Sequence, residues 1–210
     1  MDLPKQTNYQ TALDIAWDNL TRREPDEIEA LGARRDAQCP RRWHLAVLDG
    51  EFDIDLNERT IEVAAKGDEG RRSPDVAWRI LALHYLLADV PVSHTGRLIS
   101  FEQIPEARGY ARPYNGRVIG RFCATVGRER ESISSAVVAI GAKLVTGGDL
   151  AARIEVFPHV SVTIIWYAGD DEFPPGASFL YEDTITKLLP VEDIVVTAER
   201  LVSRLSGKPW

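Results

Sequence analysis

Three carboxylates stand together at Asp170, Asp171 and Glu172, two residues after the apolar run 164–167. Clustered oxygen ligands suit a hard cation such as Mg²⁺ or Ca²⁺, and crowded carboxylates can raise one pKa enough for general acid–base chemistry. We therefore treat the triplet as a candidate ligand site, with Asp171 and Glu172 as the candidate metal ligands. The alternative is a solvated turn whose carboxylates cap a helix or pair with arginine, and a lone acidic triplet favours that alternative.

A second group of residues with chemical potential lies between residues 107 and 128, which hold five arginines and no acidic residue. Arginine and tyrosine together suit a ligand that carries a carboxylate or a phosphate. The candidate ligand-binding residues are Tyr110, Arg112, Arg117 and Arg121, of which the last two share a helix face because they are four positions apart. Alternatively, these arginines form a solvated helix face, or they pair inside the fold with the acidic loop that holds residues 170–172.

The four histidines lie far apart in the sequence, at His44, His84, His94 and His159. No pair has the spacing of four that places two imidazoles on one helix face for a metal ion. His84 falls inside an apolar segment, which favours a hydrogen-bonded core histidine over a ligand or a proton-transfer group. His94, in the loop 92–96, is better placed for chemistry that faces solvent.

Sequence motifs for common catalytic or cofactor chemistry are missing. There is no glycine-rich nucleotide loop, no nucleophile elbow and no helical zinc motif. Cys39 and Cys123 are too few for a thiolate zinc site or an iron–sulfur cluster. No catalytic residue is identified, and whether the protein is an enzyme stays open.

The charge of the chain is unevenly distributed. The 210 residues carry a net charge of −7, which argues against nucleic acid as a partner. Residues 169–199 hold eight acidic residues and one basic residue, so the whole net charge belongs to this segment. The acidic segment and the arginine segment must either pair with each other or form the two sides of a site.

Length and hydropathy limit the architecture. With 44% apolar residues, the chain can bury a core as one domain over residues 1–210. No apolar run approaches the roughly 20 residues that cross a bilayer, and the N-terminus has no secretory pattern. We therefore expect a cytoplasmic protein that does not interact with membranes.

Hydrophobic periodicity predicts an α+β fold. Alternation favours an N-terminal three-stranded antiparallel meander, with a turn at Asp49-Gly50, and further strands in the C-terminal half. Helical spacing favours a central buried helix over 73–88, around which the sheet and the other helices pack. The expected helices are 8–23, 26–31, 73–88, 114–126, 132–145 and 191–205. The expected strands are 43–47, 52–56, 61–63, 97–101, 153–157 and 160–167, and the expected loops include 67–72 and 169–176.

The stretches WYAGDDEFPP at 166–175 and LLPVED at 188–193 resemble an uncharacterised prokaryotic domain-of-unknown-function family that is common in anaerobes. The likeness extends to LHYLL at 83–87, to LISF at 98–101 and to the opening helix. Some members of that family are fused to a small cysteine-rich iron–sulfur module. The resemblance therefore implies a role near low-potential redox or corrinoid metabolism, with corrinoid or haem as the cofactor. Because the module's cysteines are missing here, a cluster would belong to an iron–sulfur or corrinoid protein partner.

Three functions follow from these observations. The first is a ligand- or cofactor-binding accessory protein whose pocket is built from the acidic loop, the arginine segment and the loop around His94. The second is a metal-dependent enzyme that uses the loop 170–172 with a histidine as base. The third is a protein-interaction subunit with an apolar surface patch.

Overall fold

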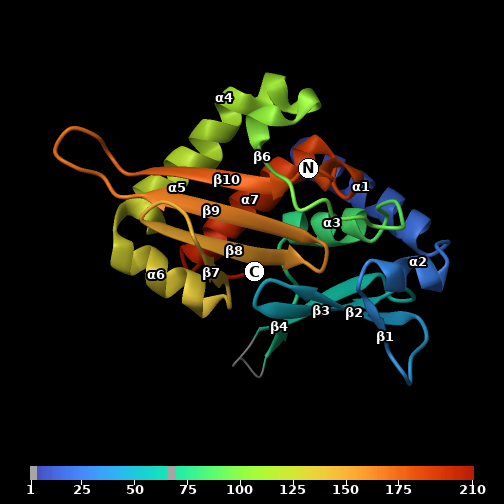
Figure 1. Ribbon diagram of the computed structural model, residues 1–210. Helices are drawn as coiled ribbons and strands as arrows, with labels where there is room; N and C mark the ends of the chain where they lie inside the picture. The colour runs from blue at the N-terminus through green and yellow to red at the C-terminus, as the bar shows by residue number, and fades with distance from the viewer. Residues whose placement is uncertain (1–3, 66–69) are drawn as a thin grey trace. The chain divides into compact units, whose positions relative to one another are not determined.

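A computed structural model of the chain describes residues 4–65 and 70–210 (Figure 1). It confirms the α+β class, with helices and two antiparallel sheets. The chain divides into two compact units, one of residues 1–92 with Trp210 and one of residues 93–209. Part of the expected loop 67–72 lies outside the described residues. Among the helices that are described, none is long and apolar enough to cross a membrane.

The first unit contains a five-stranded antiparallel sheet in the order β1-β2-β3-β4-β5, with helices packed on one side (Figure 1). Its central strands form the predicted meander, which short strands extend at each edge. The elements are α1 (Pro4–Leu20), α2 (Pro25–Ala30), β1 (Arg34–Arg35), β2 (Arg42–Val47), β3 (Gly50–Asp55), β4 (Thr60–Ala65), β5 (Arg71–Arg72) and α3 (Val76–Tyr85).

Helix α3 is buried as predicted and supplies much of the core of this unit, whereas the C-terminal strands, expected to pack around it, form a second sheet in the other unit. The carboxylate of Asp75 caps it by accepting a hydrogen bond from Trp78 N at 3.0 Å. Trp78 then packs against Phe52 and Trp210, with ring centroids 6.3 and 5.2 Å away. Strand alternation directs Phe52 to this side and leaves the polar residues of β3 on the other face.

The second unit contains another five-stranded antiparallel sheet, in the order β6-β10-β9-β8-β7, and α7 crosses one of its faces (Figure 1). The predicted helix 191–205 is confirmed as α7. The strand β10 was not predicted. The elements are β6 (Leu98–Ser100), η1 (Phe101–Gln103), η2 (Pro105–Tyr110), α4 (Ala111–Tyr114), η3 (Asn115–Gly120), α5 (Arg121–Ala124), η4 (Val126–Arg128), α6 (Arg130–Ala139), β7 (Lys143–Val145), β8 (Leu150–Phe157), β9 (Val160–Tyr167), β10 (Gly176–Glu182), η5 (Ile185–Lys187) and α7 (Val191–Leu205).

The helix predicted over 132–145 was wrong in its last turns. Gly141 has φ +72°, and the amide of Ala142 donates to Val137 O at 2.9 Å, which is the hydrogen bond of a glycine-terminated helix end. Helix α6 therefore ends at Ala139, and the following residues form β7. The helix predicted over 114–126 is also interrupted, because a π-helical segment separates α4 from α5.

Aromatic side chains anchor the helices of the second unit to its sheet. Tyr114 stacks on Phe101 with ring centroids 4.0 Å apart, and its hydroxyl lies 2.7 Å from that of Tyr181 on β10. Burial raises the pKa of both tyrosines above the ordinary value of 10.0, so both phenols stay neutral. On β9, the indole of Trp166 donates to Gly127 O at 2.6 Å. These contacts fix β9 and β10, whose ends carry the residues considered next.

Candidate functional site

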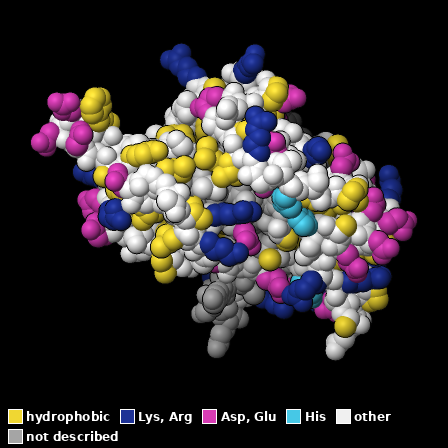
Figure 2. Space-filling model, viewed as in Figure 1, with side chains coloured by type: hydrophobic (Ala, Val, Ile, Leu, Met, Phe, Trp, Pro, Cys, Tyr) yellow, Lys and Arg dark blue, Asp and Glu magenta, His cyan; other side chains and the backbone are white. Residues whose placement is uncertain are grey.

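The acidic loop connects β9 to β10 and protrudes from the second unit (Figure 2). The carboxylate of Asp170 accepts hydrogen bonds from the amides of Glu172 and Phe173 at 2.9 and 2.7 Å. These bonds hold the pKa of Asp170 below its ordinary value, with the Phe173 amide as the larger cause. Asp170 therefore shapes the turn, whereas Asp171 and Glu172 are exposed at its tip.

An open pocket of about 590 Å³ lies beside this loop. The loop residues 168–175 line one side of the pocket, while residues 128–131 and Trp166 line the rest. Arg128 is the member of the arginine segment that reaches the pocket. Residues 128–131 also include Glu129 and Glu131, so the lining carries charges of both signs.

Two of the candidate arginines, Arg117 and Arg121, face α7. Arg117 Nε forms an ion pair with Glu199 at 2.5 Å, and Arg121 donates to Ser203 Oγ at 2.9 Å. Arg117 and Arg121 are four positions apart, and so are Glu199 and Ser203. One face of the helical segment 115–124 therefore contacts one face of α7.

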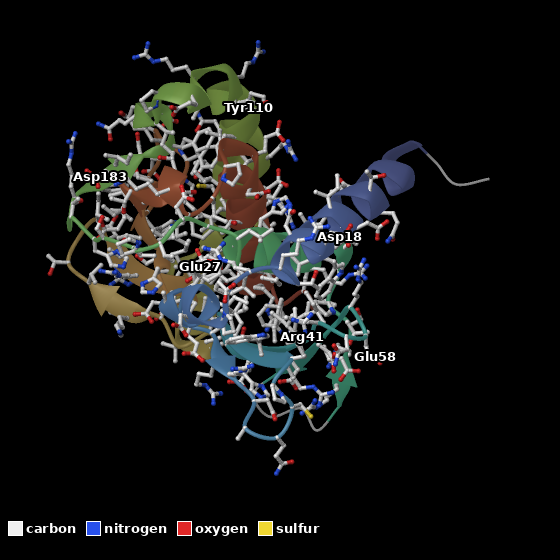
Figure 3. All side chains as sticks on the ribbon, turned by 90° about the vertical axis from the view of Figure 1, so that its right-hand side faces the viewer. Asp18, Glu27, Arg41, Glu58, Tyr110 and Asp183 are labelled. Atoms are coloured by element: carbon white, nitrogen blue, oxygen red, sulfur yellow. The ribbon has the colours of Figure 1, made fainter. Side chains whose placement is uncertain are left out.

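The tyrosine of this segment also contacts α7. Tyr110 donates to Glu192 Oε1 at 3.0 Å, and this bond raises the pKa of the phenol (Figure 3). Arg112 is exposed. Within the arginine segment, Arg117 and Tyr110 therefore pair with acidic residues of α7, while Arg121 bonds a serine of the same helix.

The two candidate histidines belong to different units. His84 is half-buried on α3 of the first unit. His94 lies in the second unit, where its side chain is 41% exposed. Its partner is His159, with His94 Nε2 and His159 Nδ1 separated by 3.2 Å. The planes of the two rings are inclined by 32°.

Sheet topology explains this pairing of residues 65 positions apart. His94 precedes β6, His159 occupies the turn that leads into β9, and Glu182 is the last residue of β10. Because β6 and β9 both run antiparallel to β10, the starts of β6 and β9 and the end of β10 meet at one end of the sheet.

The acidic loop lies at the other end of the same strands. β9 has eight residues, so the two ends are roughly 26 Å apart at about 3.3 Å per residue. The structure therefore does not gather His94, the acidic loop and the arginine segment around one pocket.

Glu182 lies beside His94, at the ring nitrogen that does not face His159. Its side chain is 7% exposed, and its Oε1 lies 4.0 Å from His94 Nδ1, an ion-pair distance. The other oxygen, Oε2, accepts hydrogen bonds from the amides of Thr95 and Gly96 at 3.3 and 3.2 Å. The neighbouring Asp183 accepts a hydrogen bond from the hydroxyl of Thr95 at 2.5 Å (Figure 3). The loop that carries His94 is thus tied to the end of β10.

His159 and Glu182 were not among the predicted site residues. His159 follows Phe157-Pro158, a strand end before a turn, and Glu182 lies on the strand that was not predicted. If β10 had been predicted, its antiparallel pairing with β9 would have placed His159 and Glu182 at the same end of the sheet. The chemistry available at this site is metal coordination by imidazole nitrogen, or proton transfer between the two rings.

The family model described as "Domain of unknown function (DUF3786)" matches residues 25–204. No curated protein and no solved structure matches the chain. The matched residues include most of the first unit and nearly all of the second, with the His94 site among them. The chain therefore belongs to the DUF3786 domain family.

Proposed function

We propose that this chain is a ligand- or cofactor-binding accessory protein, and that His94 and His159 bind the metal of its ligand. The observation that carries the proposal is the 3.2 Å separation of two imidazole nitrogens at the end of the second sheet. Two nitrogens bound to one tetrahedral zinc ion at 2.0–2.1 Å lie about 3.3 Å apart, so the pair already has the spacing of two ligands of one ion.

The surroundings of the pair favour the same role. A ligating histidine commonly orients its second nitrogen toward a carboxylate, and Glu182 lies on that side of His94. Imidazole suits zinc, copper, iron and nickel ions. The exposure of His94 leaves further coordination positions to solvent or to a ligand.

The resemblance to domains fused to iron–sulfur modules extends the proposal to a metal-bearing cofactor. Haem iron takes an axial histidine, and the cobalt of a corrinoid accepts the same donor. In that arrangement His94 Nε2 or His159 Nδ1 would supply the nitrogen that holds the metal, while Glu182 would face the other nitrogen of His94. An iron–sulfur or corrinoid protein as partner and a cytoplasmic location belong to this proposal.

The test begins with purification in the absence of oxygen, followed by metal analysis and an ultraviolet–visible spectrum. The metal-free protein is then titrated separately with Zn²⁺, haem and a corrinoid, with His44→Ala as the background so that the imidazole of the first unit binds no ion. We expect His94→Ala and His159→Ala each to weaken binding at least tenfold, while the double variant D171A/E172A binds as the parent does. A protein that is colourless and metal-free, and that binds none of the three, would overturn the proposal.

A metal-dependent enzyme that uses Asp171 and Glu172 is the second candidate. It is favoured by the open pocket beside the acidic loop, which could accept a small substrate. This function predicts that Mg²⁺, Mn²⁺ or Zn²⁺ raises the melting temperature of the parent more than that of D171A/E172A. An equal response of the two proteins would exclude it.

An interaction subunit is the third candidate, and exposed apolar side chains on α6 and β7 favour it. Val138 and Leu144 are 66% and 63% exposed, and β7 is an edge strand of its sheet. Leu144→Lys should then abolish association in sedimentation experiments. A parent protein that shows no association at any concentration and captures no partner would count against it.

A further inference from the structure

A second histidine cluster lies in the first unit, on the face of its sheet opposite the core. His44 on β2 is paired directly with Asp53 on β3, and Glu51 is two residues before Asp53. Cross-strand partners and residues two apart share a sheet face, so all three side chains project to the same side. Asp53 is 8% exposed although it lies on the polar face.

Three donor atoms converge in this cluster. One ligand atom from each of His44, Glu51 and Asp53 lies within 4.8 Å of the other two. His44 Nδ1 is 3.7 Å from Glu51 Oε1 and is in contact with Asp53 Oδ1. One imidazole nitrogen with two carboxylate oxygens is a donor set that first-row divalent metal ions accept.

Arginines occupy the other oxygen of each carboxylate. Arg71 pairs with Asp53 Oδ2 at 2.6 Å, and Arg34 pairs with Glu51 Oε2 at 2.6 Å. Each carboxylate therefore keeps one oxygen directed at His44 while the far oxygen is held. This arrangement orients the two donors before any ion binds.

The second nitrogen of His44 faces a third carboxylate. His44 Nε2 lies 3.1 Å from Asp36 Oδ2, while Asp36 Oδ1 accepts from the amides of Gln38 and Cys39, each at 2.8 Å. A neutral imidazole donates from only one nitrogen. With the proton on Nε2, the lone pair of Nδ1 faces the oxygens of Asp53 and Glu51. Only a bound cation or a second ring proton makes that arrangement favourable.

We propose that His44 Nδ1, Glu51 Oε1 and Asp53 Oδ1 bind one divalent first-row metal ion, with Asp36 orienting the imidazole from the outer shell. Because Arg71 and Arg34 already pair with the two ligand carboxylates, Asp36 supplies the further negative charge beside the ion, and its hydrogen bond fixes the ring tautomer. Three protein ligands leave a fourth tetrahedral position for water or a small ligand. This inference does not depend on the site proposed at His94.

The test uses the H94A/H159A variant of the full chain, so that any Zn²⁺ bound at the other histidine pair is removed. After treatment with a chelator, equilibrium dialysis against Zn²⁺ should show one bound equivalent and a raised melting temperature. Adding His44→Ala should abolish this binding, and Asp53→Asn should weaken it at least 100-fold. Asp36→Asn should weaken it 10- to 100-fold, as loss of an outer-shell partner does.

Glu62→Gln is the matched control, because Glu62 lies opposite Asp53 on the same sheet face and is not a proposed ligand. It should bind Zn²⁺ as H94A/H159A does, and circular dichroism should show each variant to be folded. Absence of Zn²⁺ binding by H94A/H159A, or equal binding by the His44→Ala variant, would overturn the proposal. A ¹⁵N spectrum in which both nitrogens of His44 keep their protons at saturating Zn²⁺ would also overturn it.

Discussion

In the first unit, one imidazole is surrounded by three carboxylates, whereas in the second an imidazole lies between one carboxylate and another imidazole. The His44 cluster is therefore anionic and directs three donor atoms at one point. The His94 cluster offers two imidazole nitrogens and an exposed side. The carboxylates around His44 give its proposed site three protein ligands, whereas the proposed site at His94 has two.

Charge removal should affect the first cluster more than the second. In H94A/H159A, Asp53→Asn replaces a proposed ligand and should weaken Zn²⁺ binding at least 100-fold. In a His44→Ala variant, Glu182→Gln should weaken binding at His94 by 10- to 100-fold, because Glu182 acts on the ring from the outer shell. Equilibrium dialysis measures both. If Glu182→Gln weakened Zn²⁺ binding more than Asp53→Asn does, the comparison would be reversed and Glu182 would be identified as a direct ligand.

Loss of a buried hydroxyl in the second unit should lower the stability of the protein and weaken the His94 cluster without affecting the His44 cluster. Tyr114→Phe leaves the hydroxyl of Tyr181 without its partner, at a cost of about 1–3 kcal/mol. Tyr181 precedes Glu182, so this change should loosen the His94 site and leave Zn²⁺ binding at His44 unchanged. Thermal unfolding gives the cost, and dialysis of each site gives the selectivity.

The same tyrosine pair predicts a loss of stability in alkali. Because the pKa of each phenol is raised by burial, their contribution is fully present below the ordinary value of 10.0 and is lost as the pH rises above it. Urea unfolding from pH 8 to 11 should show this decline in the parent and a shallower one in Tyr114→Phe. Parallel curves would exclude the pair as its source.

The arginines beside the first cluster should have a smaller effect. Arg34→Ala removes a positive charge from Glu51, which is 45% exposed, and should tighten cation binding about two- to fivefold. Salt should reduce this gain because the pair faces solvent. Dialysis at low and high salt provides the test. Weaker binding in Arg34→Ala would instead show that its main role is to orient Glu51.

The acidic loop should respond least, because neither proposed metal site includes it. Asp170→Ala should increase the mobility of the hairpin, while Asp170→Asn keeps the turn through its amide oxygen. Because the pKa of Asp170 is lowered, its contribution is present above 3.8 and is lost as the pH falls through the lowered value. Backbone ¹⁵N relaxation measures the mobility. An effect of either change on Zn²⁺ binding would connect the loop to a site.

Much of the fold could be predicted from periodicity, and the errors have local causes. Helix α7 was predicted with its observed bounds because its apolar residues follow the helical period closely. β10 was missed because its sequence, GASFLYE, begins with small residues after Pro-Pro and does not alternate cleanly. The end of α6 was missed because Gly141 lies inside an otherwise apolar run.

The two clusters differ in how far the sequence could have revealed them. A turn at Asp49-Gly50 pairs His44 with Asp55, whereas the observed turn at Leu48-Asp49 pairs it with Asp53. Both registers leave His44 on the polar face, so the predicted turn differs from the observed one by a shift of two residues in the partner of His44. The pairing of His94 with His159 depends on strand order in the second sheet, which no local spacing encodes.

Trp210 belongs to the first unit, although every residue from 93 to 209 belongs to the second. Its ring is 7% exposed and packs with Phe52 and Trp78, at 5.3 and 5.2 Å between centroids. On the ribosome, the aromatic core of the first unit is therefore complete only after the whole second unit has been synthesised. A nascent chain stalled before Trp210 would present Phe52 and Trp78 to chaperones without the ring that covers them.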